Sequence, residues 1–194
     1  MNPVEKTYVM IKPDGVQRGL VGPVIARLER AGLKLIALKM VRLTKRDAEA
    51  FYPTSAEWFK SVGEKTLKNY AKYGIDAKNV LGTSDPEKIG RLIKEWLLKF
   101  VTSAPVVCMA WEGNHAVENV RKLVGATYPL DAVPGTIRGD YSIESADFSN
   151  EQKRAVINLI HASSDPQEAK RELALMFKES DFVSYARVEE KIFE

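Results

Sequence analysis

His161 is one of two histidines in the sequence, and it lies where a carboxylate can reach it. It ends the apolar run NLIH, and after a short loop Asp165 and Pro166 begin a helix that carries Glu172. On one straight helix the two side chains would stand roughly 16 Å apart, because each residue adds ~1.5 Å, so we expect them on different elements. A carboxylate that holds one imidazole nitrogen fixes the tautomer and leaves the other nitrogen free to attack. The pair therefore predicts a nucleophilic histidine, although such pairs are also common as purely structural contacts.

Three basic side chains are candidates for holding an anion near that histidine. Lys12 ends an apolar strand, Arg121 lies at the edge of the apolar stripe of a helix, and Arg138 lies in the loop PGTIRGD. Each of them, taken alone, could equally be a solvated or ion-paired residue. Neither GxxxxGKS/T nor GxGxxG occurs, so a nucleotide would be bound through side-chain cations and hydroxyls and not through a glycine-rich loop.

The composition is that of an ordinary globular protein of one domain. The chain has 194 residues, 45% hydrophobic and 28% charged, and its formal net charge of +3 is spread without a block of lysine or arginine. A nucleic-acid-binding stripe is therefore not expected. The N-terminal sequence lacks the features of a signal peptide, and no apolar run approaches the roughly 20 residues that span a bilayer. Because the single cysteine, Cys108, lies in an apolar run, a reducing compartment is indicated, and we expect a cytoplasmic protein without a membrane segment.

Strands and helices alternate along the chain, which favours an α/β layering. Strands are predicted at 7–12, 33–43, 105–113 and around INLIH, at 157–161. Helices are predicted at 22–32, from a Thr44 N-cap to about 52, twice within 60–102, at 115–125 after an Asn114 N-cap, and from Pro166 to 177. His115 is expected to be a surface residue at a helix start. The segment 126–142 is predicted to be a loop, and a loop of that length without its own structure is usually functional or disordered.

Several motifs together resemble the nucleoside diphosphate kinase family, in order and at compatible spacings. They are VMIKPDGVQRGLVG, Tyr52, PVVCMAWEG, the arginine of ENVRKLVGAT, PGTIRGDYS, and NLIHASSD with Glu172, and they span nearly the whole chain apart from its inserts. The resemblance implies a ferredoxin-like βαββαβ core, an α+β sandwich with a four-stranded antiparallel sheet. It also implies one domain over 1–194, with a helical insertion at about 60–102 and a smaller insertion at about 146–156.

The resemblance further implies a ping-pong reaction, in which His161 takes the γ-phosphate of a nucleoside triphosphate and passes it to a nucleoside diphosphate. Glu172 would orient His161, Tyr52 would lie beside it, and Ser163 would support the site. The nucleotide contacts that the family implies are Lys12 on the phosphates and the ribose 3′-hydroxyl, Arg121 and Thr127 on the β-phosphate, Arg138 on the outer phosphate, and Asn158 on the ribose hydroxyls.

The base is expected to be gripped by stacking, which accepts purine and pyrimidine nucleotides alike, ribo or deoxyribo, because every base has a π-face. Phe59 is the candidate and Trp58 the rival, and either ring could instead pack in the core or in a lid. Mg²⁺ would be held mainly by the nucleotide phosphates and water, so no metal ligand is assigned. The family usually has His-Gly-Ser-Asp where this chain has HASS at 161–164, so the acidic group close to the metal is displaced or missing.

Family members assemble as hexamers or tetramers, so a homo-oligomer built from dimers is expected. Two other functions remain open at this point. One is a nucleotide sensor or assembly protein whose inserts close the site; it would be expected to lack His161, Lys12 or an arginine, and none is lacking. The other is an enzyme that passes the phosphohistidine group to water or to a protein side chain, which depends on how well the site excludes water.

Overall fold

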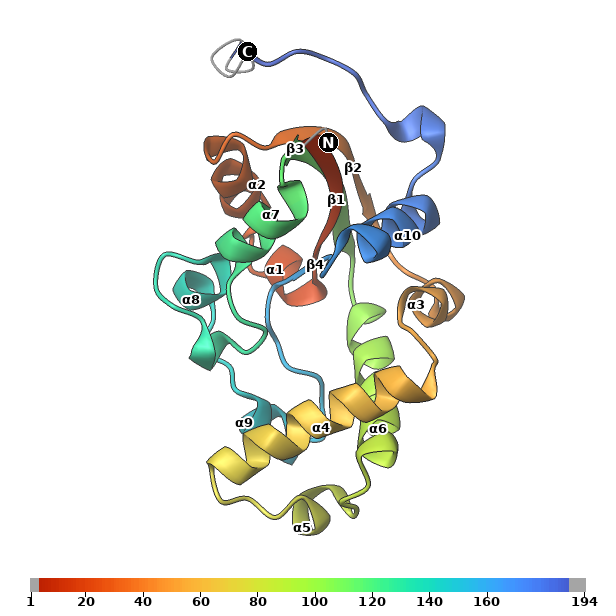
Figure 1. Ribbon diagram of the computed structural model, residues 1–194, viewed down its shortest axis with the longest axis vertical. Coiled ribbons are helices and arrows are strands. Elements are labelled where there is room, and N and C mark those ends of the chain that lie inside the picture. Colours follow the sequence, from red (N-terminus) through yellow and green to blue (C-terminus); the bar gives the residue numbers. More distant parts are fainter. Residues whose placement is uncertain (1–3, 189–194) are drawn as a thin grey trace.

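The computed structural model describes residues 4–188, and its centre is one antiparallel sheet (Figure 1). The spatial order of the strands is β2-β3-β1-β4, and every neighbouring pair is antiparallel. The chain passes through α-helices between β1 and β2 and again between β3 and β4. This is the topology of a ferredoxin-like fold, so the predicted fold class is confirmed. The strands are β1 (Val4–Ile11), β2 (Lys34–Val41), β3 (Val106–Asn114) and β4 (Ile160–Ala162).

Most helices begin where the sequence predicts them. Thr44 caps its helix through a reciprocal capping box with Asp47, and Asp165 caps another by accepting a hydrogen bond from the amide of Glu168. The predicted loop 126–142 contains two short helical segments, so it has structure of its own. The helices outside the insertion are α1 (Pro13–Gln17), α2 (Val21–Arg30), α3 (Lys45–Phe51), α7 (Ala116–Val124), η1 (Pro129–Asp131), α8 (Ile137–Tyr141), α9 (Ala146–Glu151), α10 (Pro166–Met176) and η2 (Glu179–Asp181).

Both faces of the sheet are covered, which buries its central strands. Side chains alternate between the faces of a strand, and the four residues from Tyr8 to Ile11 are all fully buried. Val9 and Ile11 belong to the core under α2 and α7, whereas Tyr8 and Met10 belong to the core under α3 and α10. The strand predicted at 7–12 therefore lacks a polar face because neither of its faces meets water.

The N-cap predicted at Asn114 is wrong. Asn114 is the last residue of β3, and the N-cap of α7 is His115, whose φ of 43° lies in the left-handed region. A left-handed residue turns the chain directly from the strand into the helix, and no side chain caps α7. Asn119 instead donates a hydrogen bond to the carbonyl oxygen of Asn114 at 2.8 Å. His115 is exposed, as predicted.

A helical insertion between α3 and β3 extends away from the sheet (Figure 1). It consists of α4 (Ala56–Lys72), α5 (Ala77–Leu81) and α6 (Pro86–Val101). Both helical patterns predicted in this region are thus observed, with α5 between them. The insertion has a small core of its own, formed by Tyr70, Ala77 and Ile89.

The two long helices of the insertion touch through their backbones. A Cβ placed on Gly63 of α4 would overlap the backbone of Pro86, and one placed on Gly90 of α6 would overlap the backbone of Phe59. Glycine at both positions therefore allows an approach that a side chain would prevent. The contact fixes α4, which carries several residues of the candidate site.

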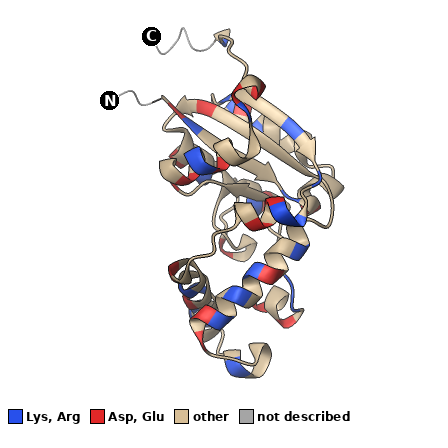
Figure 2. Ribbon diagram, turned by 90° about the vertical axis from the view of Figure 1, so that its right-hand side faces the viewer, with Lys and Arg blue, Asp and Glu red and all other residues tan. Residues whose placement is uncertain are grey.

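Charges of both signs alternate along the insertion helices, as Figure 2 shows. Lys60 and Glu64 form an ion pair one turn apart on α4, and Glu87 and Arg91 do so on α6. Such exposed pairs support a helix by a few tenths of a kcal/mol each. Within residues 4–188, no helix has both the length and the apolar content that crossing a bilayer requires.

Gly90→Ala is expected to destabilise the protein by about 1–3 kcal/mol, because the added methyl group must displace the backbone of Phe59. Urea denaturation followed by circular dichroism measures the change. Gly22→Ala in α2 is the control: a Cβ there meets no atom within 4 Å, and alanine favours a helix over glycine, so its midpoint should stay or rise. Equal midpoints for the two variants would contradict the backbone contact between α4 and α6.

Candidate active site

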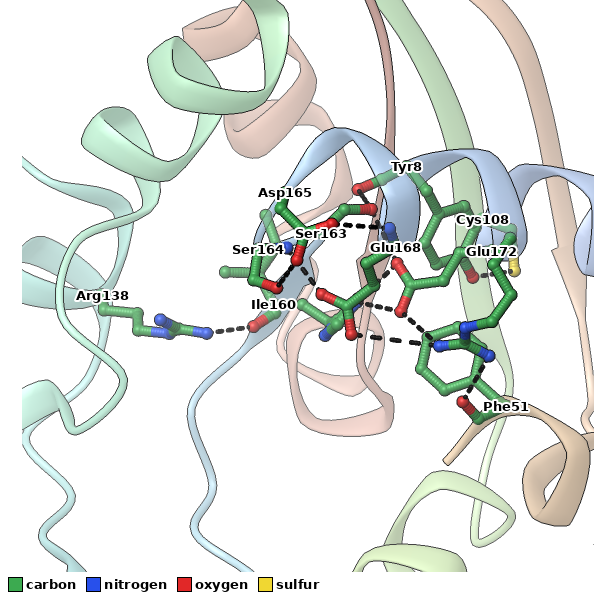
Figure 3. Close-up of polar contacts among 12 residues, drawn as sticks. Tyr8, Phe51, Cys108, Arg138, Ile160, Ser163, Ser164, Asp165, Glu168 and Glu172 are labelled. Atoms are coloured by element: carbon green, nitrogen blue, oxygen red, sulfur yellow. Dashed lines mark hydrogen bonds and ion pairs between the residues drawn. The ribbon is translucent and has the colours of Figure 1, made fainter. Parts of the chain in front are cut away.

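The ring of His161 is held at one nitrogen by a buried carboxylate. Its Nε2 lies 2.9 Å from both carboxylate oxygens of Glu172, which is 1% exposed. Ser163 donates a second hydrogen bond to Glu172 at 2.7 Å, and Arg171 lies 3.5 Å away (Figure 3). Among the described residues nothing hydrogen-bonds Nδ1 of His161, whose side chain is 22% exposed. The predicted contact between the pair is therefore present, and the second ring nitrogen is free.

The backbone brings His161 and Glu172 together from two elements. His161 lies on the short strand β4, where it pairs with Met10 of β1, and Glu172 lies in the second turn of α10. Leu159 has a left-handed φ of 65° just before β4, and it is fixed there because its amide donates to the carboxylate of Asp14 at 3.0 Å. After β4 the chain turns into α10 at the Asp165 N-cap. These two turns set the position of the histidine relative to the helix.

Lys12, Asn158 and Thr127 form a hydrogen-bonded chain beside the histidine strand. The ammonium group of Lys12 donates to Oδ1 of Asn158 at 2.6 Å, and Nδ2 of Asn158 donates to the carbonyl oxygen of Thr127 at 2.8 Å. Burial and then the neighbouring charge of Arg138 lower the pKa of Lys12 to about 7, while Asp14 acts in the opposite direction. The three predicted nucleotide contacts are therefore close together, and the charge of Lys12 is poorly compensated.

Arg138 is buried and bound to backbone carbonyl groups. Burial and the nearby charge of Arg121 lower its pKa to about 10, so it stays charged at neutral pH. Figure 3 shows its bond to Ile160, at 2.6 Å. Its other acceptors are the carbonyl oxygens of Gly125, Ala126 and Asn158. The guanidinium thus joins the segment after α7 to the segment around β4, in addition to lining the cavity described next.

A cavity of about 380 Å³ is lined by His161 and by most of the other predicted site residues. Ser163 does not line it, because it is fully buried beneath Glu172. Burial raises the pKa of Tyr52, which keeps its hydroxyl protonated. The predicted residues that line the cavity are Lys12, Tyr52, Arg121, Thr127, Arg138, Asn158, His161 and Glu172.

Phe59 is the one predicted contact residue that lies away from the site. It is 5% exposed and packs between the helices of the insertion, with the guanidinium of Arg91 4.5 Å above its ring. Trp58, its rival, lines the cavity. Neighbouring residues of a helix point about 100° apart, so only one of the two rings can face the histidine, and the sequence alone did not identify which.

Lys65 and Glu168 also line the cavity, and the sequence analysis did not assign them to the site; Ser164, noted there in place of the family's usual aspartate, lines it as well. Lys65 stands two turns after Trp58 on α4, so the helical period could have placed it on the same face. Glu168 accepts a hydrogen bond from the amide of Ser164 at 2.6 Å, which closes the first turn of α10. No spacing signal pointed to that contact.

A second and larger cavity, of about 680 Å³, adjoins the first. The two share Lys12, Lys65, Thr127 and Asn158 in their linings. The larger cavity lies between α4, the segment that follows α7, and the segment around α9. The two spaces therefore adjoin at the shared residues, and basic side chains line both of them.

Comparison with known proteins agrees with this geometry. A sequence model described as nucleoside diphosphate kinase matches residues 5–68 and 86–182. The nucleoside diphosphate kinase of Pyrobaculum aerophilum is 55% identical over 179 residues, 92% of this chain and 98% of that protein. The crystal structure of an NDP kinase from Pyrobaculum aerophilum has a TM-score of 0.90 at 53% identity and covers 94% of this chain and 100% of that chain. A transition-state mimic of the Borrelia burgdorferi enzyme with bound vanadate and ADP has a TM-score of 0.77 at 36% identity and covers 98% and 96%.

The two matched ranges include the histidine, the glutamate and the cations of the site. The stretch between them, 69–85, falls within the helical insertion, at the end of α4 and across α5. Since the match extends over most of the chain and a relative is 55% identical over 92% of it, this protein belongs to the nucleoside diphosphate kinase family.

Proposed function

We propose that His161 carries the phosphoryl group in the nucleoside diphosphate kinase reaction of this protein. The observation that supports it is the pairing of Nε2 with Glu172, which leaves Nδ1 without a partner among the described residues, in a cavity that His161 lines together with Lys12, Arg121 and Arg138. A carboxylate that accepts the Nε2 proton selects the tautomer whose lone pair is on Nδ1. The nucleophile and the anion-binding groups therefore line one cavity.

In the first half-reaction, Nδ1 attacks the γ-phosphorus of a nucleoside triphosphate. A bond forms between nitrogen and phosphorus, the bond from phosphorus to the β-phosphate oxygen breaks, and a nucleoside diphosphate leaves. Glu172 stabilises the positive charge that develops on the imidazole. In the second half-reaction, a terminal oxygen of another nucleoside diphosphate attacks that phosphorus and frees the imidazole, so the enzyme ends as it began.

The cations bind the charge that the phosphates bring. Arg121 and Thr127 stand at the cavity wall on α7 and just after it, where they would hold the β-phosphate. Arg138 would act mainly through its positive charge, because most of its N–H donors already bind carbonyl groups. Positive groups that are fixed before substrate binds stabilise a loose phosphoryl-transfer transition state without reorganisation.

We propose Mg²⁺ as the cofactor, held mainly by the nucleotide. Among the described residues, no three histidine, cysteine or acidic side chains gather where they could hold a metal. The lining carboxylates of Glu168 and Glu172 already accept hydrogen bonds, from the amide of Ser164 and from the hydroxyl of Ser163. When bound, Mg²⁺ would neutralise phosphate charge. Ser164, which stands where the family usually has an aspartate, is consistent with a metal that is held mainly by the nucleotide.

We propose that the sugar lies at Asn158 and Lys12 and that the base enters the larger cavity. That placement follows from continuity, because both residues line both spaces. Purine and pyrimidine nucleotides, ribo or deoxyribo, would be accepted as substrates. Trp58 lines only the cavity over the histidine, so we infer that it forms a wall at the phosphate end.

A homo-oligomer built from dimers, either a hexamer or a tetramer, is the assembly that we propose. β2 is an edge strand of the sheet, and Leu38 and Met40 on it are 48% and 58% exposed. Apolar side chains on an open strand edge are typical of an interface and would otherwise favour aggregation. The edge of β2 is therefore the surface that we expect to meet a second copy.

A cytoplasmic location is proposed from the state of the single cysteine. Cys108 is buried and free, and burial raises the pKa of its thiol. A thiol of this kind gains nothing from an oxidising compartment, and free cysteines are typical of reducing ones.

His161→Ala is expected to abolish transfer of the γ-phosphate and to leave the fold in place, because Ser163 and Arg171 still contact the carboxylate of Glu172. Incubation with γ-labelled ATP, with and without a nucleoside diphosphate, measures both half-reactions. The wild type should carry acid-labile label that moves to the acceptor. His115→Ala is the matched control and should behave as the wild type. Free phosphate released without acceptor would instead indicate a hydrolase, and a wild type without label would contradict the proposal.

Glu172→Ala is expected to lower kcat by about 10- to 100-fold, the usual effect of losing an orienting partner. The KM for nucleotide should change little, because Glu172 contacts the histidine ring and a carboxylate does not attract the phosphates. Steady-state kinetics measure both constants. Lys170→Ala, exposed on the same helix, serves as the control. Full turnover in the Glu172 variant would show that this carboxylate is only structural.

Lys12→Met is expected to abolish activity. It should also remove the pH dependence of the free energy of unfolding that Lys12 causes. The pKa of Lys12 is about 7 in the folded state against 10.5 for a free side chain, so between those values the unfolded chain binds more protons than the folded one. The free energy of unfolding of the wild type, relative to the variant, should therefore increase as the pH rises from 7 to about 10. Urea denaturation at several pH values tests this. A difference that is constant with pH would contradict the lowered pKa.

A further inference from the structure

The turn that follows α3 carries two rings that pack around the histidine. Phe51, the last residue of α3, is 2% exposed, and its ring meets the ring of His161 at nearly a right angle, with the centroids 5.1 Å apart. Tyr52 comes next, lines the cavity of His161, and packs against Phe51 at 5.3 Å between ring centroids. Among the described residues nothing hydrogen-bonds the Tyr52 hydroxyl, so its position depends on ring packing and on the backbone that carries it.

That backbone is held by two cations from different helices. The last carbonyl groups of a helix have no partner within the helix. Arg171 of α10 donates to the carbonyl oxygen of Phe51 at 3.1 Å (Figure 3). Lys94 of α6 donates to the carbonyl oxygens of Tyr52 and Pro53, at 3.3 and 3.2 Å. The turn is therefore bound by α10 of the central fold and by α6 of the helical insertion.

Lys94 is buried without an acidic partner. It is 8% exposed, and no carboxylate of the described residues forms an ion pair with it. Its ammonium group lies 5.8 Å from the ring centroid of Phe59. Burial lowers the pKa of Lys94, and the charge of Glu49 acts in the opposite direction. Removing an ammonium group from water costs free energy unless hydrogen bonds compensate for it, and here the two carbonyl groups supply those bonds.

The two cations together fix the direction in which Tyr52 points. The carbonyl group of Phe51 belongs to the peptide plane before the Cα atom of Tyr52, and the carbonyl group of Tyr52 belongs to the plane after it. Because peptide units are planar, holding both planes sets the direction of the Cα–Cβ bond between them. Pro53 restricts the backbone further, since a residue before proline is confined to extended conformations, and Tyr52 has φ −85° and ψ 130°.

We propose that Lys94 is a positioning residue for phosphoryl transfer, which holds the backbone of Tyr52 so that the Tyr52 side chain stays beside His161. The proposal rests on the function proposed above and gives α6 of the insertion a part in it. Lys94 lines neither of the two cavities, so it acts through Tyr52 and not on the nucleotide. A lysine that served only to stabilise the end of α3 would change the free energy of unfolding and leave the turnover of the folded enzyme as it was.

Lys94→Met tests the proposal, because it keeps an unbranched side chain and removes its hydrogen-bond donors. Lys94→Arg returns a positive donor, and Lys99→Met, exposed on the same helix, is the control. The rate of enzyme phosphorylation by γ-labelled ATP, kcat, KM and the midpoint of urea denaturation are measured for each variant. The same Lys94→Met substitution is then made in a Tyr52→Phe background, which lacks the hydroxyl that Lys94 is proposed to place.

Lys94→Met is expected to lower kcat by about 10-fold, because small displacements of groups around a reacting centre are costly, and to leave the KM for nucleotide nearly unchanged. Lys94→Arg should regain most of the turnover, and Lys99→Met should match the wild type. In the Tyr52→Phe background, Lys94→Met should lower kcat no further, because substitutions that act through one group are not additive.

An equal loss of kcat in the two backgrounds, or a lower urea midpoint with full kcat, would show that Lys94 only supports the fold. Lys94→Leu, which also removes the donors, replaces the methionine variant if that one does not fold. If the wild type is labelled and Lys94→Met turns over normally, the inference is wrong although the kinase reaction stands. If the wild type takes up no label, the proposed function itself has failed.

Discussion

The contact between the carboxylate of Glu172 and the ring of His161 is the interaction on which the site depends. A carboxylate that is 1% exposed would be costly without donors, and it has them in Ser163, Arg171 and the imidazole. α10 must therefore stay packed on β1, because only that packing keeps the carboxylate beneath the ring. The same contact that compensates a buried charge also decides which nitrogen faces the substrate, so stability and reactivity have one cause.

Arg138 extends that arrangement to the rest of the site. Its bonds to the carbonyl groups of Gly125, Ala126, Asn158 and Ile160 connect the chain before Thr127 to the chain on either side of Leu159. The residues proposed to hold phosphate, sugar and phosphoryl group thus share one buried cation. A frame of this kind keeps catalytic groups in position before substrate binds, which is where most electrostatic catalysis originates.

Much of this site could be predicted from the sequence, because its chemistry is carried by short motifs. The strand at 7–12, the cap at Asp165 and the pair of His161 with Glu172 follow from local patterns. What could not be predicted depends on a single backbone angle or on distant segments. The left-handed backbone of His115 shifted the N-cap of α7 by one residue. Phe59 and Trp58 are neighbours on α4 and point in different directions, and it is Trp58 that lines the cavity. The larger cavity is formed by α4 and the region of α9, which no local pattern brings together.

The burial of Lys12 has a consequence for how nucleotides bind. With its pKa near 7, this side chain is only partly protonated in the empty enzyme at neutral pH. Phosphate oxygens beside it favour the ammonium form, so its pKa must rise when a nucleotide arrives. Binding is therefore coupled to the uptake of a proton, and the affinity for substrate weakens as the solution becomes more alkaline. The enzyme would bind its charged substrate partly by becoming more positive at the moment of contact.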